Sequence, residues 1–122
     1  MHVAGVGDSI FVFGSNLAGR HGRGAALFAA ENYLAERGVG VGRTGYAYAI
    51  PTKDAKLVPL GLNLIQGHVE EFIRYARDHP DLHFIVTRVG CGLAGYTDGQ
   101  IGPMFANAPA NCELPHGWAR NT

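Results

Sequence analysis

Two glycine-rich turns, each lying between an apolar run and a helical pattern, constrain the fold of this chain most strongly. The first turn, FGSNLAGRHGRGAA, covers residues 13–26, and the second, GCGLAGYTDG, covers residues 90–99. The run before each turn, at residues 10–13 and 82–89, is typical of a buried strand. Glycine at a strand-to-helix turn indicates a tight bend or a close approach of the backbone to another group. That group is either a ligand phosphate or another part of the protein.

The rest of the chain completes an alternation of strands and helices. We predict a helix from Ala25 to about Arg37, a strand from Tyr46 that stops at Pro51, a helix over residues 63–79, a short helix near residues 100–107 and a short last strand within residues 111–118. This order predicts an α/β domain with a largely parallel central sheet. Ligands bind such sheets beyond the carboxyl ends of the strands. If the two strands before the glycine-rich turns are neighbours, the turns form opposite walls of one cleft.

Three local patterns predict how the helices begin. Asn63 and Gln66 have the spacing of a capping box, which satisfies backbone N–H groups at a helix start. Pro103 is expected in the first turn of the last helix, where its missing N–H costs little. Asp98 has the position of a cap for that helix.

Length and composition limit the class of protein. A chain of 122 residues with 47% hydrophobic and 16% charged residues is expected to form one globular domain over residues 1–122. Its formal net charge of zero predicts neither bulk nucleic-acid binding nor attraction to a membrane surface. The chain shows no signal-peptide or transmembrane pattern, so we expect a cytoplasmic protein. Cys91 and Cys112 lack metal-ligand spacing and are expected to be free thiols, with no metal site.

The first turn offers backbone N–H groups at a helix start, an arrangement that favours anions. It matches neither a Walker A loop nor the G-x-G-x-x-G fingerprint, so tight packing explains its glycines equally well. We expect Arg20 to be a solvated charge, and His21 and Arg23 to be exposed loop residues for which ligand contact is the less favoured alternative.

The second turn provides another candidate nest for phosphate oxygens. Tyr96 either stacks on a ligand ring or packs on the turn, and Cys91 is better explained as a packed thiol than as a nucleophile. Lys53 follows AIPT at a strand end, where a desolvated lysine amine can form a Schiff base with a sugar; an exposed loop lysine is the alternative. Asp54 and Asp98 are the carboxylates closest to these segments in the sequence.

Together, the segments FGSN, GRGAALF, AIPTK and VTRVGCGLAGY resemble the macro domain, the ADP-ribose-binding fold, over roughly residues 10–107. The branch containing the human terminal ADP-ribose protein glycohydrolase is the most similar, through RVGCGL at residues 88–93. The resemblance implies a three-layer α/β/α fold with a mixed, largely parallel sheet. It also implies a short, phage-type member without the family's usual strands before Ile10.

The resemblance implies a site and its chemistry. Lys53 matches the family's nucleophile, but Ala94 occupies the position of its catalytic aspartate. Asp98 is the candidate replacement and Asp54 the alternative, although neither matches the motif. Asn16 matches an asparagine that orients the distal ribose. The expected ligand-binding residues are Gly14, Ser15, Asn16, Gly22, Arg23, Gly24, Ala25, Thr52, Gly90, Cys91, Gly92, Leu93, Ala94, Gly95 and Tyr96.

Three functions are consistent with this pattern. The first is a glycohydrolase that binds ADP-ribose, or a related NAD-derived nucleotide, and cleaves an ADP-ribosyl linkage on a macromolecule without any cofactor. The second is a non-catalytic module that recognises or sequesters such a ligand, which Ala94 favours. The third is a structural protein that keeps the fold and binds no nucleotide.

Overall fold

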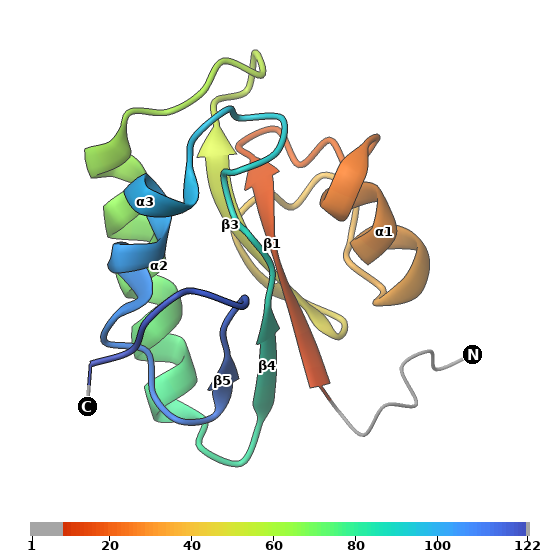
Figure 1. Ribbon diagram of the computed structural model, residues 1–122. Helices are drawn as coiled ribbons and strands as arrows, with labels where there is room; N and C mark the ends of the chain where they lie inside the picture. Colours follow the sequence, from red (N-terminus) through yellow and green to blue (C-terminus); the bar gives the residue numbers. More distant parts are fainter. Residues whose placement is uncertain (1–8, 122) are drawn as a thin grey trace.

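The computed structural model describes residues 9–121 and shows an α/β fold around a five-stranded sheet (Figure 1). The strands are β1 (Ser9–Asn16), β2 (Gly42–Thr44), β3 (Ala47–Lys53), β4 (His83–Val86) and β5 (Cys112–Glu113). Their order across the sheet is β2-β3-β1-β4-β5. All neighbouring pairs are parallel except β2 and β3. The predicted α/β fold with a mixed, mostly parallel sheet is confirmed.

The helices cover the two faces of the sheet and make three layers (Figure 1). α1 (Gly24–Asn32) lies on one face, and α2 (Leu62–Asp78), α3 (Asp98–Ile101) and the 3₁₀ helix η1 (Gly102–Phe105) lie on the other. Pro103 stands at the start of η1, in a first turn as expected. Among residues 9–121, no helix has the length and apolar character needed to cross a membrane.

The larger core lies between the sheet and α2. The helix presents one apolar stripe at helical spacing, and every member of the stripe is buried: Ile65, Val69, Phe72, Ile73 and Ala76. The Phe72 ring, which is fully buried, packs against the rings of Tyr48, Phe84 and Phe105 at centroid distances of 5.1–6.2 Å. This packing holds α2 against β3 and β4 of the sheet.

The smaller core lies under α1 and is built from small side chains. Ala26 and Ala29 of the helix pack near Phe13 of β1 and Ala47 and Ala49 of β3. Because alanine is short, α1 lies close to the strands. The start of α1 is therefore held near the carboxyl ends of β1 and β3.

Strand register brings both glycine-rich turns to the same edge of the sheet. Asn16, the last residue of β1, is paired with Lys53, the last residue of β3. Past the end of β4, Thr87 donates to the Val12 carbonyl oxygen through its backbone N–H (3.1 Å) and through Oγ1 (2.8 Å). The second turn therefore starts beside the middle of β1, opposite the first.

The ends of α1 and β3 differ from the sequence prediction. α1 ends at Asn32 rather than near Arg37, because Leu34 adopts a left-handed backbone conformation (φ 61°) that a helix does not contain. β3 continues through Pro51 to Lys53 instead of stopping at the proline. Its edge partner β2 pairs only with residues 47–49, so no partner strand requires an N–H at position 51 on that side.

The predicted caps are also corrected. α2 begins after Gly61, which makes no side-chain cap, so Asn63 lies inside the first turn and forms no capping box with Gln66. A capping box does form at α3, where Thr97 is the N-cap and pairs reciprocally with Gln100. Asp98 is thus a first-turn residue and not the cap.

Asn111 ties the end of α2 to the start of β4. Its Nδ2 donates to the carbonyl oxygens of Ala76, His79 and Leu82 at 3.0–3.1 Å. Asn111→Ala removes these three part-buried contacts and should lower the free energy of unfolding by about 1–3 kcal/mol. Urea denaturation measures this change. Asn107→Ala, which removes an exposed bond to Asn121, is the control and should change it by less than about 0.5 kcal/mol.

Candidate functional site

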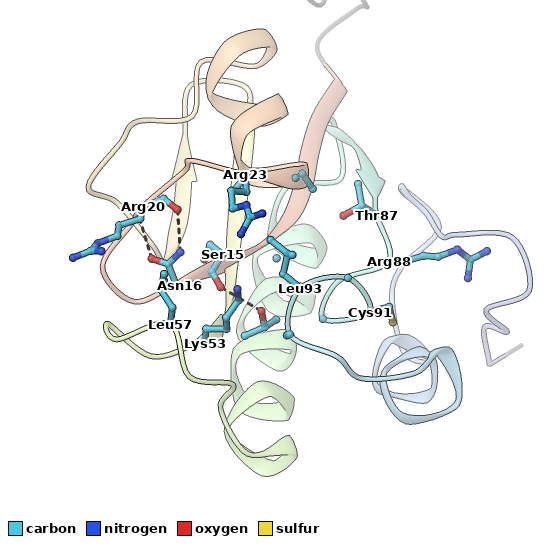
Figure 2. A pocket seen from close by; sticks show the side chains of 18 of the residues that line it. Ser15, Asn16, Arg20, Arg23, Lys53, Leu57, Thr87, Arg88, Cys91 and Leu93 are labelled. Carbon is cyan, nitrogen blue, oxygen red and sulfur yellow. Dashed lines mark hydrogen bonds between the residues drawn. The ribbon is translucent and has the colours of Figure 1, made fainter.

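A cleft of about 650 Å³ lies between the two glycine-rich turns, at the carboxyl ends of β1, β3 and β4 (Figure 2). The sequence-predicted residues that line it come from four segments: Gly14, Ser15, Asn16, Gly22, Arg23, Gly24, Ala25, Thr52, Lys53, Gly90, Cys91, Gly92, Leu93 and Ala94. The expectation that the two turns form opposite walls of one cleft is confirmed. Gly95, Tyr96 and Asp98, which were also expected in the site, do not line it.

The first turn of α1 opens on this cleft without a protein cap. Arg23 is the N-cap and makes no side-chain hydrogen bond to the helix, and the first turn contains no acidic residue. Gly24, Ala25 and Ala26 all line the cleft. Backbone N–H groups at an uncapped helix start carry partial positive charge and favour an anion. This end of α1 is therefore a place where a phosphate or carboxylate of a ligand is stabilised.

The glycines of the two turns serve two different purposes. Gly14 and Gly90 allow close packing: a Cβ on Gly14 would lie 3.3 Å from the Gly90 nitrogen. Gly22 and Gly92 meet no other atom within 4 Å of such a Cβ, so their bare backbone faces open space. Packing accounts for the first pair and leaves the second pair available to a ligand.

Two side chains with unpaired positive charge point into the cleft. Figure 2 shows Lys53 reaching into the space from the end of β3 and Arg23 reaching toward it from the start of α1. Within residues 9–121, neither side chain forms a hydrogen bond or ion pair with the protein. Both charges are thus available to an anionic ligand.

Asn16 is placed at the cleft, but its amide is occupied. Its Oδ1 accepts from the Arg20 backbone N–H and its Nδ2 donates to the Arg20 carbonyl oxygen, both at 2.9 Å. Asn16 is also buried, with 6% of its surface exposed. Its side chain therefore closes the first turn and fixes Arg20, which lines the cleft.

Tyr96 and Asp98 brace the second turn from outside the cleft. The Tyr96 hydroxyl donates to the Leu60 carbonyl oxygen at 2.5 Å, so the ring packs on the turn. Asp98 Oδ1 accepts from Trp118 Nε1 (2.8 Å) and from Arg88 Nη1 (2.6 Å). These bonds from Trp118 and Arg88 lower the pKa of the Asp98 carboxyl group. A carboxylate held in this way is a poor proton acceptor.

Cys91 lines the cleft with a thiol that is not activated. Burial raises its pKa, and the negative charge of Asp98 adds to that effect. Its Sγ lies 3.6 Å from the Val89 carbonyl oxygen. Cys112 is buried in the core, and burial raises its pKa to about 11. Both cysteines are free. Cys91 therefore contributes shape and not nucleophilicity.

His21, expected to be an exposed loop residue, is buried instead. Only 2% of its surface is exposed, and its ring packs edge-on against Phe13 with centroids 5.3 Å apart. Its backbone carbonyl accepts from Arg37 Nη1 at 2.8 Å. Neither ring nitrogen has a hydrogen bond of good geometry, although the backbone carbonyls of Glu36 and Val39 lie near the ring. The ring packs the first turn against β1. The order of residues in the sequence does not predict this role.

Burial lowers the pKa of His21, and the charge of Arg37 adds to this, while the carbonyls of Glu36 and Val39 oppose it. The unfolded chain takes up the proton first, near pH 6.5. His21 therefore contributes stability that is present above about pH 6.5 and is lost as the pH falls toward its folded pKa.

We expect His21→Phe to reduce the loss of thermal stability between pH 7 and pH 5. Melting temperatures followed by circular dichroism across this range measure the effect. His116→Phe, on an exposed histidine, is the control. An unchanged pH profile in His21→Phe would show that the buried ring does not govern this dependence.

Five further residues line the cleft that the sequence analysis did not assign to it: Arg20, Ala26, Leu57, Thr87 and Arg88. Arg20 and Ala26 lie within the first turn, and Thr87 and Arg88 lie just before the second, so their positions in the sequence are close to the predicted site residues. Leu57 offers no such signal, because its turn curls back through the Leu60–Thr52 and Val58–Asp54 backbone contacts. Arg88 points away from the cleft toward Asp98 (Figure 2).

Within residues 9–121, no three His, Cys, Asp or Glu side chains gather in a group that could hold a metal ion. The groups that this cleft offers to a ligand are cations, backbone N–H groups and hydroxyls.

No protein-family model matches the chain, and no curated protein matches its sequence. A solved structure with a similar fold is described as "Structure of a Protein of Unknown Function from Bacteroides thetaiotaomicron". It superposes with a TM-score of 0.56 and 18% identity, over 84% of this chain and 82% of that chain. At 18% identity, the structural similarity supports the fold alone.

Proposed function

We propose that the cleft binds ADP-ribose or a closely related NAD-derived nucleotide, free or attached to a macromolecule. One observation carries the proposal: the uncapped start of α1 and the unpaired Arg23 and Lys53 face a single cleft between two glycine-rich turns. A diphosphate is the ligand group that suits convergent N–H groups and cations. The resemblance of the same turns to macro domains indicates which nucleotide carries this diphosphate.

The size and lining of the cleft support this proposal. A volume of about 650 Å³ is within the usual range for a small-molecule site. Leu57 and Leu93, which are 42% and 60% exposed, add apolar surface at its rim. Apolar surface beside a polar diphosphate site suits a ligand with sugar and base rings on either side of its phosphates.

Isothermal titration calorimetry with ADP-ribose tests this function, with AMP and NAD as controls. We expect micromolar binding that is selective for ADP-ribose. Arg23→Ala should weaken it about tenfold or more, since a charge-assisted bond to phosphate contributes about 1.5–3 kcal/mol. Arg74→Ala, on the exposed side of α2, is the control and should leave the affinity unchanged. Selective binding with an unchanged affinity in Arg23→Ala would show that the ligand binds at another site.

Binding without turnover is the activity that the lining favours. Among the described residues that line the cleft there is no Asp, Glu or His. A glycohydrolase needs a group that takes or gives a proton beside the scissile bond. Asp98, the candidate for that role, is bonded to Arg88 and Trp118 outside the cleft.

Hydrolysis of an ADP-ribosyl linkage is a second candidate function, and the position of Lys53 is the observation that favours it. In this mechanism the Lys53 ammonium group first gives a proton to water. The amine then attacks the anomeric carbon of the distal ribose, and the bond to the attached group breaks with that group taking the electron pair. The ring-opened sugar forms a Schiff base, and water then releases ADP-ribose and regenerates the amine.

We expect Lys53→Ala to abolish any turnover while weakening ADP-ribose binding less than Arg23→Ala does. Release of ADP-ribose from an ADP-ribosylated acidic peptide, followed by chromatography, measures turnover. Lys56→Ala is the matched control, since Lys56 is exposed and does not line the cleft. Release by Lys53→Ala at the wild-type rate would exclude the lysine mechanism. No release by the wild type would leave binding as the function.

A further inference from the structure

The two ends of the cleft offer different groups to a ligand. Lys53 lies at one end together with Asn16, whereas Thr87, Arg88 and Cys91 line the opposite end (Figure 2). In the function proposed above, on which this inference rests, the distal ribose lies at Lys53 and the diphosphate lies at the start of α1. The base of the nucleotide therefore lies beyond the diphosphate, toward Thr87.

The polar side chains at the Thr87 end are already bonded within the protein. Thr87 Oγ1 donates to the Val12 carbonyl oxygen at 2.8 Å. The Arg88 guanidinium points away from the cleft and donates to Asp98 at 2.6 Å. The Cys91 thiol donates to a backbone carbonyl oxygen of its own turn at 3.6 Å. These three side chains therefore have no donor directed at a base.

The backbone carbonyls on this side of the cleft are occupied as well. Those of Thr87, Arg88, Gly90 and Gly92 each accept a backbone N–H from within residues 89–96, at 2.7–3.0 Å. Among the described residues that line the cleft, no Asp or Glu supplies a carboxylate in their place. The Thr87 hydroxyl oxygen keeps a free lone pair, but it accepts the amino group of adenine or the N1–H of another purine alike.

The surface that remains for the base is apolar. Leu93 is 60% exposed, and a Cβ on Gly24 would lie 3.9 Å from its Cδ1, so Leu93 stands beside the first residue of α1. Ala25 and Ala26 continue this surface along the helix. An apolar surface holds the flat face of a base by burial, which does not depend on the donors and acceptors at the edge of that base.

From these contacts, we propose that the cleft recognises the ribose–diphosphate part of its ligand and does not distinguish one purine base from another. Its ligands are then purine nucleoside diphosphate-riboses as a class, of which ADP-ribose is one. Sites that bond the edge of a substrate reject an analogue with a different edge by factors of about 10⁴–10⁵, whereas apolar pockets reject isosteres weakly.

Calorimetric titration with three ligands tests the proposal: ADP-ribose and its inosine and guanosine analogues, IDP-ribose and GDP-ribose. Adenine presents a 6-amino donor where guanine presents a 6-oxo acceptor. Hypoxanthine, the base of IDP-ribose, also has the 6-oxo group and is nearly the same shape as adenine. We expect the three dissociation constants to agree within about fivefold. Weaker binding of IDP-ribose or GDP-ribose beyond that factor would overturn the proposal and leave the proposed function standing. Failure of all three to bind would overturn both.

A leucine variant tests the apolar contact. Leu93→Ala should weaken all three ligands by the same factor, about threefold or more, because the face of the base loses buried surface. Leu64→Ala is the matched control, since Leu64 is 55% exposed on α2 and does not line the cleft. Unchanged affinities in Leu93→Ala, or a loss confined to ADP-ribose, would overturn the proposal.

Discussion

Gly22→Asp is expected to reduce the affinity for ADP-ribose by about 30-fold or more while leaving the fold intact. A Cβ at Gly22 meets no other atom within 4 Å, and its backbone is not in the left-handed region, so the side chain fits without strain. It places a carboxylate beside the uncapped start of α1, where we expect the diphosphate. Like charges about 4 Å apart near a protein surface repel by a few kcal/mol, roughly 4 kcal/mol before screening by salt.

Gly67→Asp is the matched control for this experiment. It makes the same chemical change in α2, where a Cβ also meets nothing within 4 Å, and it does not line the cleft. Calorimetry gives both affinities, and thermal melts verify that both variants are folded. Wild-type affinity in a folded Gly22→Asp protein would show that the start of α1 does not hold the phosphates.

Phe72→Ala is expected to have the largest effect on stability. The ring is fully buried between the sheet and α2 and packs against three other aromatic rings. Its removal loses the burial of the ring and leaves a cavity, which together should lower the free energy of unfolding by about 3–5 kcal/mol. For a chain of this length, the melting temperature should fall by roughly 10–20 °C.

Phe28→Ala is the matched control for Phe72→Ala. Phe28 is 49% exposed on α1, and its ring lies beside the partly buried rings of Phe11 and Tyr33. Its truncation should cost about 1 kcal/mol or less. Chemical denaturation measures both changes. A similar decrease in the free energy of unfolding in the two variants would show that the core between α2 and the sheet is not the main source of stability.

The core and sheet of this protein were predictable because their signals are local and periodic. The stripe from Ile65 to Ala76 has helical spacing, and residues 10–13 of β1 and 84–86 of β4 are uninterrupted apolar runs, as expected for strands covered on both faces. The left-handed Leu34 that ends α1 carries no such signal, since leucine is a good helix former. Its backbone packs closely against Gly45, where an added Cβ would lie 2.4 Å from the Leu34 carbonyl oxygen.

The candidate site was predictable where residues follow the strand ends directly. Lys53, Gly22 and Gly92 come to one cleft because parallel strands end at the same edge of the sheet. Pairing between side chains was not predictable from spacing. Asp98 lies outside the cleft, where it accepts a hydrogen bond from Trp118, 20 residues later in the chain. His21 is a polar residue, yet it is buried, with its ring packed edge-on against Phe13.

The central claim is that the glycine-rich turns bind an ADP-ribose-type nucleotide, and chemical-shift mapping by ¹⁵N NMR tests it most directly. Glycine amides are well separated in such spectra, and the chain carries them both in the cleft and far from it. On titration with ADP-ribose, we predict large shifts at Gly22, Gly24, Gly90 and Gly92, and none at Gly67 in α2. No shifts at millimolar ligand, or shifts confined to glycines outside the cleft, would contradict the claim.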